Sequence, residues 1–383
     1  MPPLADDADP LALQKASLRF LLSPVVSLLD DPSVSEIMIN GARDIRVERG
    51  GKISRTDLHF ASEAHLLAAA RNLAQYVGKR ISSDTSRFDA RLPDGSRVHV
   101  VLPPTSRQGI CVAIRKFQKS RMTLDALVQY GSITEEAREF VEICVLIEKN
   151  MIVSGGTGTG KTSLLNVLSG LIPPGQRILV LEDTSELDLK ADHVLYFEAR
   201  PPDRYGKGAV SIRDLFHSSL RMRPDRVVVG ECRGGEAIDL IQAMTSGHGG
   251  SMTTLHANAP ADALNRLETM ALMSGIEIPL VALRSQVASA IDIVVQVGRF
   301  HDGSRRILDI AEVHGLNERG GYDVKSIYAF AFKGKGPDGR VIGQLERTGN
   351  RPTFWDEVAQ KGYTDRVRLT SDLWGASVEG ESR

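Results

Sequence analysis

Residues 155–162 form a glycine-rich segment whose residue types and spacing suit the binding of phosphate. The segment reads Gly-Gly-Thr-Gly-Thr-Gly-Lys-Thr and matches the pattern G-x-x-x-x-G-K-[ST] in full. An apolar strand is expected before it and a helix after it, so backbone N–H groups would converge on phosphate oxygens. Lys161 would reach the β- and γ-phosphates, and the Thr162 hydroxyl would bind Mg²⁺. We therefore expect ATP and Mg²⁺ as ligands, with nucleotide contacts from Gly156, Thr157, Gly158, Thr159, Gly160, Lys161, Thr162 and Ser163.

Two glutamates follow short apolar segments and are candidates for the carboxylate that a nucleoside triphosphatase needs. Residues 178–181 are Ile-Leu-Val-Leu and precede Glu182, while residues 227–230 are Val-Val-Val-Gly and precede Glu231. Such a carboxylate at a strand end holds Mg²⁺ or orients the attacking water. Position alone allows either glutamate to do so, and either could instead cap the loop that follows its strand.

Two histidines lie on either side of a third apolar segment. Residues 247–250 are Gly-His-Gly-Gly, and Thr253-Thr254-Leu255 is expected to form a strand that ends at His256. The sequence nearby offers no cysteines or ligand pairs for a metal site. One hypothesis is a γ-phosphate sensor at the strand end, but spacing alone favours ordinary histidines of a core or a turn.

The elements that must position these residues divide into two regions. Strand–turn–strand patterns at 37–47 and 88–102, with a helix from Glu63 to Val77, indicate a small mixed α/β region. From Thr134 onward, nearly all-apolar strands alternate with helices, which is typical of a parallel sheet covered on both faces. We expect a tail and the start of the first helix at 1–24, an N-terminal α/β domain at 25–117, a linker at 118–133, and an ATPase domain with a C-terminal extension at 134–383.

Smaller signals complete the predicted organisation. Leu11 to Leu29 has apolar residues at helical spacing, broken by Pro24. Two strands are expected around Asp302-Gly303, and another near 322–332. Beyond Gly334 the chain is rich in glycine and charge, and a short helix is expected at 355–361.

The composition is that of an ordinary globular protein. The 383 residues are 42% hydrophobic and 25% charged, and 47 basic against 48 acidic residues give a net charge of -1. This charge and the 5% of aromatic residues argue against nucleic acid as a partner. Three separated cysteines fit a reducing cytosol. Without a signal peptide or an apolar run of about 18 residues, membrane contact is expected only through a partner.

Four segments together resemble the boxes of the secretion-superfamily ATPases, which drive type II secretion, type IV pili and type IV secretion. Residues 34–41 and 88–97 add to the likeness, and the wording is closest to the Tad/Flp pilus assembly ATPases (CpaF-like). Four boxes in the right order are a specific signal. The Walker A, Asp, Walker B and His boxes correspond to 155–162, 178–187, 220–237 and 245–258.

The resemblance implies roles for the glutamates and histidines. Glu182 matches the Asp-box glutamate and would be the general base for the attacking water. Glu231 matches the Walker B glutamate and would support Mg²⁺ or water, so the division of work between the two glutamates stays open. His256 matches the His-box residue near the γ-phosphate, and His248 is assigned to the nucleotide with it.

The resemblance also implies roles for four arginines. Arg91, Arg97 and Arg115 match arginines that the N-terminal domain presents toward bound nucleotide. Arg221 matches the arginine that precedes the Walker B strand. Composition alone favours a solvated strand face for the hairpin arginines. The tetracysteine metal site of some type II secretion ATPases is missing from this sequence, which argues against that branch.

The implied protein is a RecA-like P-loop ATPase domain with a smaller mixed α/β N-terminal domain, assembled as a homo-hexamer. It would hydrolyse ATP to power assembly, or also retraction, of a Tad/Flp-type pilus or a related secretion machine. Inner-membrane platform proteins would be its partners, and it would be cytoplasmic and peripheral to the membrane through them. Two alternatives remain: a RecA-like nucleic-acid motor, such as a helicase or recombinase, and a nucleotide-binding scaffold without turnover.

Overall fold

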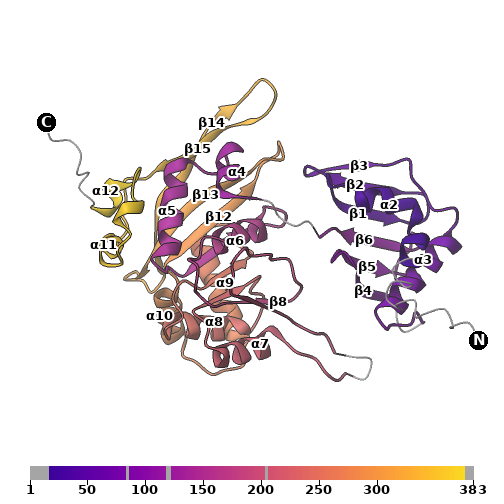
Figure 1. Cartoon of the computed structure of the whole chain (residues 1–383), viewed down its shortest axis with the longest axis horizontal. Helices are drawn as coiled ribbons and strands as arrows, with labels where there is room; N and C mark the ends of the chain where they lie inside the picture. Colours follow the sequence, from indigo (N-terminus) through magenta and orange to yellow (C-terminus); the bar gives the residue numbers. More distant parts are fainter. Residues whose placement is uncertain (1–16, 83–85, 118–121, 203–205, 376–383) are drawn as a thin grey trace, which may run out of the picture. The chain divides into compact units, whose positions relative to one another are not determined.

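The chain divides into two compact units, Met1–Lys119 and Ser120–Arg383. A computed structural model describes residues 17–82, 86–117, 122–202 and 206–375. Each unit has its own sheet and its own buried apolar core, and Figure 1 labels many of the elements of both. The expected fold class, a smaller mixed α/β domain followed by a larger α/β domain, is confirmed. Within the described residues, no helix is both long and apolar enough to span a bilayer.

The first unit is built on a six-stranded antiparallel sheet in the order β3-β2-β1-β6-β5-β4. The two strand–turn–strand predictions are confirmed as the pairs β1–β2 and β4–β5. The strands are β1 (Val34–Asn40), β2 (Ile45–Arg49), β3 (Lys52–Arg55), β4 (Arg87–Arg91), β5 (Arg97–Val101) and β6 (Cys111–Arg115).

Two helices, α2 (Ser23–Asp30) and α3 (Glu63–Tyr76), pack with the buried face of this sheet. Ser62 caps α3 as expected, because its hydroxyl accepts the N–H of His65 at 3.1 Å. Residues 17–21 are helical, the helix is interrupted at Leu22, and Pro24 lies in the first turn of the next helix, α2, so the expected break is confirmed.

The second unit is built on a nine-stranded mixed sheet in the order β15-β14-β13-β12-β7-β11-β10-β8-β9. The six strands from β12 to β9 in this order run parallel, and β13, β14 and β15 extend one edge as an antiparallel meander. The strands are β7 (Met151–Gly155), β8 (Ile178–Glu182), β9 (Val194–Glu198), β10 (Arg226–Val229), β11 (Met252–Leu255), β12 (Ile293–Arg299), β13 (Arg305–Leu316), β14 (Tyr322–Lys335) and β15 (Val341–Arg347).

Helices cover both faces of the parallel part, which explains why its strands are apolar throughout. Met151 and Val153 of β7 lie in the core that includes α5 and α6, whereas Ile152 between them lies in the core that includes α7 to α10. The helices are α4 (Leu124–Gln129), α5 (Glu135–Leu146), α6 (Lys161–Ser169), α7 (Ile212–Ser219), η1 (Leu220–Met222), α8 (Glu236–Thr245), α9 (Pro260–Leu272), α10 (Leu280–Ala290), α11 (Glu357–Gln360), η2 (Thr364–Arg366) and α12 (Ser371–Trp374).

Two segments differ from what the sequence suggested. The expected linker 118–133 contains helix α4, whose Leu124 is buried in the core of the second unit. The glycine- and charge-rich segment beyond Gly334 contains β15, which pairs with β14. Both elements are held by tertiary packing or pairing, which local composition does not report.

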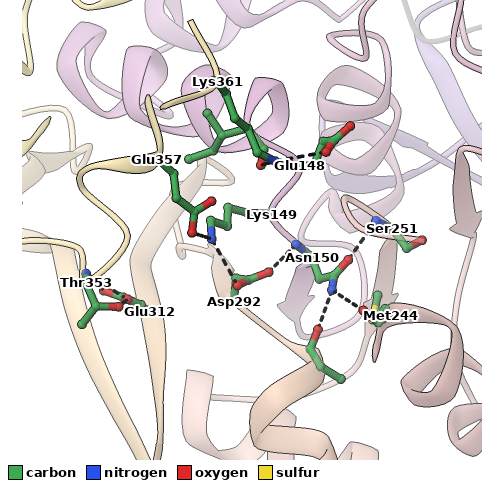
Figure 2. A network of polar contacts seen from close by, with 12 residues as sticks. Glu148, Lys149, Asn150, Met244, Ser251, Asp292, Glu312, Thr353, Glu357 and Lys361 are labelled. Carbon is green, nitrogen blue, oxygen red and sulfur yellow. Dashed lines mark hydrogen bonds and ion pairs between the residues drawn. The ribbon is translucent and has the colours of Figure 1, made fainter. Parts of the chain in front are cut away.

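The C-terminal segment 348–375 is fastened to the second unit beside the amino-terminal ends of β7 and β12, as Figure 2 shows. The Lys149 ammonium lies 2.7 Å from the Glu357 carboxylate, 3.6 Å from Asp292 and 4.2 Å from the centre of the Phe354 ring. The side chain of Lys149 is only 9% exposed, so these partners compensate for its burial. Lys149 precedes β7, whereas the glycine-rich loop follows β7. These contacts of the C-terminal segment therefore lie at the amino-terminal ends of the strands, opposite the glycine-rich loop.

Candidate functional site

The predicted site residues lie together because they follow the carboxyl ends of neighbouring parallel strands. The adjacent strands β7, β11, β10 and β8 run in the same direction, so their carboxyl ends lie side by side. The glycine-rich loop follows β7, His256 follows β11, Glu231 comes two residues after β10, and Glu182 ends β8. Ligands of open parallel sheets bind beyond this edge.

The glycine-rich loop connects β7 to α6 in a conformation that only glycine permits at two positions. Gly158 and Gly160 have φ values of 71° and 97°, and Gly160 begins α6 without any side-chain cap. The Thr159 hydroxyl donates to the Gly156 carbonyl at 2.9 Å and closes the loop on itself. The uncapped N–H groups at the start of α6 suit an anion.

Lys161 lies buried beneath this loop and contacts His256. Its ammonium donates to the Gly156 carbonyl at 3.0 Å and lies 3.3 Å from Nδ1 of His256. The other ring nitrogen, Nε2, lies 3.1 Å from Oε1 of Glu231. The Lys161 ammonium, which can only donate, also lies 3.5 Å from Nε2, so it contacts both ring nitrogens of His256.

The electrostatic surroundings favour this arrangement of charges. Burial and the neighbouring positive charge of Lys161 lower the pKa of His256, against the raising effect of Glu231. Burial raises the pKa of Glu231, but the hydrogen bond and charge of Arg233, with the charges of His256 and Lys161, outweigh it and lower the pKa overall. The imidazole of His256 therefore lies between an ammonium and a carboxylate.

Arg233 and Asp183 also belong to this site, although sequence reasoning assigned neither a role. The guanidinium of Arg233 lies 2.7 Å from Glu231 Oε2 and 3.3 Å from Asp183 Oδ2. Their positions directly beside Glu182 and two residues after Glu231 were the only signal in the sequence.

Glu182 is held more tightly than Glu231. Its side chain is almost fully buried, and its Oε1 accepts the N–H groups of Glu186 at 2.8 Å and Leu187 at 3.0 Å. A Cβ atom on Gly230, the residue after β10, would lie 2.9 Å from Cγ of Glu182, so a side chain there would crowd Glu182. The carboxylate of Glu182 is thus fixed at the end of β8.

A second element supports the glycine-rich loop from the side. Arg299 and Arg305 lie opposite each other in the β12–β13 hairpin. Nε of Arg305 donates to the Gly158 carbonyl at 2.9 Å, and a Cβ on Gly158 would lie 3.4 Å from an Arg299 guanidinium nitrogen. No sequence pattern signalled this contact, because residues 158 and 305 lie far apart in the chain.

Two predicted residues lie away from this edge within the second unit. His248 precedes β11 by four residues, and the neighbouring Gly249 lies near Glu148, before β7. His248 is therefore at the end of β11 remote from Lys161, and the structure does not bring it together with the glycine-rich loop. Arg221 lies in η1 before β10, again at the amino-terminal edge, and is exposed. The box that contains each residue includes a whole strand and the residues on both sides of it. One box therefore has residues at both ends of its strand.

The three arginines of the first unit form one row. Arg97 of β5 lies directly opposite Arg91 of β4 and Arg115 of β6. Their neighbours Ala90, Val98 and Ile114 are buried, so the arginines lie on the face turned away from the core of that unit.

The residues at the strand edge fit a nucleotide with Mg²⁺. In the described part of the chain, no group of three or more His, Cys, Asp or Glu side chains is arranged to hold a metal ion. Mg²⁺ bound with a nucleotide needs only one or two protein ligands, because phosphates and water supply the rest. Thr162 in the first turn of α6 and the partly buried Glu231 provide oxygen ligands of this kind.

Comparisons with known proteins agree with these observations. Residues 21–321 match the family model described as Type II/IV secretion system protein. The chain is 33% identical over 319 residues to the type IV secretion system protein VirB11 of Brucella suis biovar 1 (strain 1330), covering 76% of this chain and 88% of that protein. It is 34% identical over 333 residues to the type IV secretion system protein PtlH of Bordetella pertussis (strain Tohama I), covering 79% and 97%. The X-ray structure of the Legionella pneumophila ATPase DotB aligns with a TM-score of 0.55 at 18% identity, over 82% of this chain and 83% of that one, and supports the fold.

Proposed function

The chain belongs to the type II/IV secretion system protein family, and from this premise we propose that it is a Mg²⁺-dependent ATPase that powers a secretion or pilus machine. The observation that carries the proposal is the contact of Lys161 with His256, and of His256 with Glu231, directly below the glycine-rich loop. An ammonium, an imidazole and a carboxylate at this point match what transfer of a γ-phosphoryl group needs.

The roles of the residues follow from their chemistry. Lys161 binds the β- and γ-phosphate oxygens once they replace the Gly156 carbonyl as its partner. Glu182, fixed at the end of β8, orients and deprotonates the attacking water. His256 lies where a γ-phosphate oxygen would take a hydrogen bond. When bound, Mg²⁺ would neutralise phosphate charge, and Thr162 and Glu231 are the residues that would hold it.

The assembled motor is proposed to be a homo-hexameric ring. The row formed by Arg91, Arg97 and Arg115 would bind nucleotide phosphates, and Arg221, remote from the loop of its own subunit, would act at a neighbouring one. The residues in the four sequence boxes most resemble those of the Tad/Flp pilus assembly ATPases, which supports a Tad/Flp-type pilus as the machine. Platform proteins at the inner membrane would be the partners, with the chain cytoplasmic and peripheral through them.

The test is an ATPase assay on the purified full chain with Mg²⁺. We expect hydrolysis by the wild type and a loss of at least about 100-fold in Lys161→Ala, because one positive donor to the phosphates is removed. Lys325→Ala is the control, since Lys325 pairs with Asp323 on β14, outside this site. No turnover by the wild type would leave only a nucleotide-binding scaffold.

Two further measurements test the alternative of a nucleic-acid motor and the proposed hexameric assembly. Stimulation of hydrolysis by single-stranded DNA would favour a nucleic-acid motor over a secretion motor. Sedimentation with a slowly hydrolysed ATP analogue is expected to give a hexamer, and a monomer at high protein concentration would contradict the ring.

A further inference from the structure

The side chain of Arg233 connects the two strand ends that carry the two glutamates. Its guanidinium lies 2.7 Å from Glu231 Oε2, after β10, and 3.3 Å from Asp183 Oδ2, which directly follows Glu182 at the end of β8. A planar guanidinium suits this place because its donors point in fixed directions toward two carboxylates.

The backbone that carries Arg233 is itself fixed. The N–H groups of Arg233 and Gly234 donate to Glu236 Oε1 at 2.7 and 2.9 Å. A Cβ on Gly235 would lie 2.8 Å from Cα of Ser274, so the loop passes close against the end of α9. The backbone from which the Arg233 side chain extends is therefore held in place, although the side chain itself is about half exposed.

Both carboxylate oxygens of Glu231 therefore contact a neighbouring side chain. Oε2 accepts from Arg233 at 2.7 Å, and Oε1 contacts Nε2 of His256 at 3.1 Å. Two donors on opposite oxygens define the plane of a carboxylate, which a single donor does not. His256 in turn contacts Lys161, so the orientation of Glu231 is linked to that of the phosphate-binding lysine.

We propose that Arg233 is a positioning residue for ATP hydrolysis: it orients the Glu231 carboxylate and, through Asp183, sets its place relative to Glu182. The inference rests on the proposed ATPase function. It assigns Arg233 no contact with the nucleotide. Its removal should therefore slow turnover while leaving the binding of nucleotide in place.

The experiment compares Arg233→Ala, Arg233→Lys and Asp183→Asn in the full chain. We expect Arg233→Ala to lower kcat about 10- to 100-fold, the range typical of residues that orient a ligating or catalytic group. The dissociation constant of a slowly hydrolysed ATP analogue should change by less than about 2-fold, because Lys161 and the loop are intact. Arg233→Lys should recover part of the loss, since lysine keeps the charge and lacks the fork. Arg340→Ala, at an exposed pair with Asp338, is the matched control.

A double-mutant cycle separates positioning from a general loss of charge. If Arg233 acts through Asp183, the variant Arg233→Ala with Asp183→Asn should lose no more activity than Arg233→Ala alone. Strictly multiplicative losses would overturn the link through Asp183. An unchanged kcat, or an analogue affinity that falls in parallel with kcat, would overturn positioning, the latter because it makes Arg233 a phosphate ligand. These outcomes presuppose an active wild type, so they are distinct from failure of the ATPase proposal itself.

Discussion

The ammonium of Lys161 lies 3.3 Å from Nδ1 of His256, so the phosphate-binding lysine and the strand-end histidine share one hydrogen bond. A protonated imidazole would repel the ammonium, and the pKa of His256 is lowered by burial and by Lys161. Incoming phosphate would compete with His256 for the same ammonium. The histidine is thereby placed to respond to whether the terminal phosphate is present.

We expect His256→Ala to weaken binding of a slowly hydrolysed ATP analogue more than binding of ADP, and to lower kcat about 100-fold. The reason is that His256 contacts both Lys161 and Glu231, the residues that we propose act on the γ-phosphate and its Mg²⁺. Equilibrium binding of the two nucleotides and steady-state turnover test this. His248→Ala is the control, because His248 lies at the other end of β11; an equal effect of both changes would contradict the assignment.

For Glu182, the expected result depends on the substituent. Glu182→Gln keeps an oxygen that accepts the N–H groups of Glu186 and Leu187, so folding is retained while loss of the base slows turnover about 100-fold or more. Glu182→Ala leaves both N–H groups without that partner and should also cost about 2–3 kcal/mol of stability. Thermal unfolding and single-turnover rates distinguish the two variants. Full activity of Glu182→Gln would transfer the role of base to another residue.

The hairpin support of the glycine-rich loop gives a third prediction. Arg305→Met keeps the length of the stem beside Gly160 and removes the hydrogen bond to the Gly158 carbonyl. We expect the dissociation constant of an ATP analogue to rise about 3- to 10-fold with little change in thermal stability, because one charged hydrogen bond to an exposed loop is lost. Arg340→Met serves as the control for loss of an exposed arginine. Unchanged affinity would show that the loop holds its shape without the hairpin.

The buried cation Lys149 gives a prediction about the C-terminal segment. Lys149→Met leaves the Asp292 and Glu357 carboxylates without their shared partner and should lower the free energy of unfolding of the second unit by about 2–4 kcal/mol. Both tryptophans of the chain, Trp355 and Trp374, lie in this segment, so their fluorescence reports its release. Lys325→Met, at an exposed pair with Asp323, should change stability by less than about 1 kcal/mol. An equal change in the free energy of unfolding of both variants would argue against a stabilising role for the contacts of Lys149 with Asp292 and Glu357.

The sequence predicted the parts of the site that come from short local patterns on parallel strands. The glycine-rich loop, Glu182, Glu231 and His256 each follow an apolar strand, and parallel order alone is enough to bring such residues to one edge. His248 belongs to the same box as His256 and still lies at the other edge, because a box describes a stretch of chain and not a place in space.

The remaining features depend on contacts between distant parts of the chain. The bond from Arg305 to Gly158 spans 147 positions, so no spacing in the sequence marks it. Arg233 lies within the Walker B box, yet its role requires knowing that β8, which precedes Asp183, and β10, which precedes Glu231, are neighbouring strands. Helix α4 lies where low periodicity suggested a linker, because the burial of Leu124 against distant residues stabilises it.

The last prediction concerns the row of arginines in the first unit. Arg91 and Arg97 lie directly opposite each other, and Arg115 continues the row on β6. Arginine side chains bind phosphate oxygens in a bidentate way, so this row suits the polyphosphate of ATP that the proposed function supplies. Replacing Arg91 and Arg97 together with lysine keeps the charge and removes the bidentate geometry that matches phosphate.

We therefore expect this double variant to lower kcat/KM for ATP by about 10-fold or more, although the exchange is mild for a solvated strand. The same sheet offers a matched control, because Arg46 and Arg55 also lie opposite each other, near Asp44. Their replacement with lysine should leave turnover unchanged. ATPase rates of the two double variants, measured with ATP below and above KM, decide the matter. An unaltered rate in the Arg91 and Arg97 variant would mean that this row is only a solvated face of the sheet.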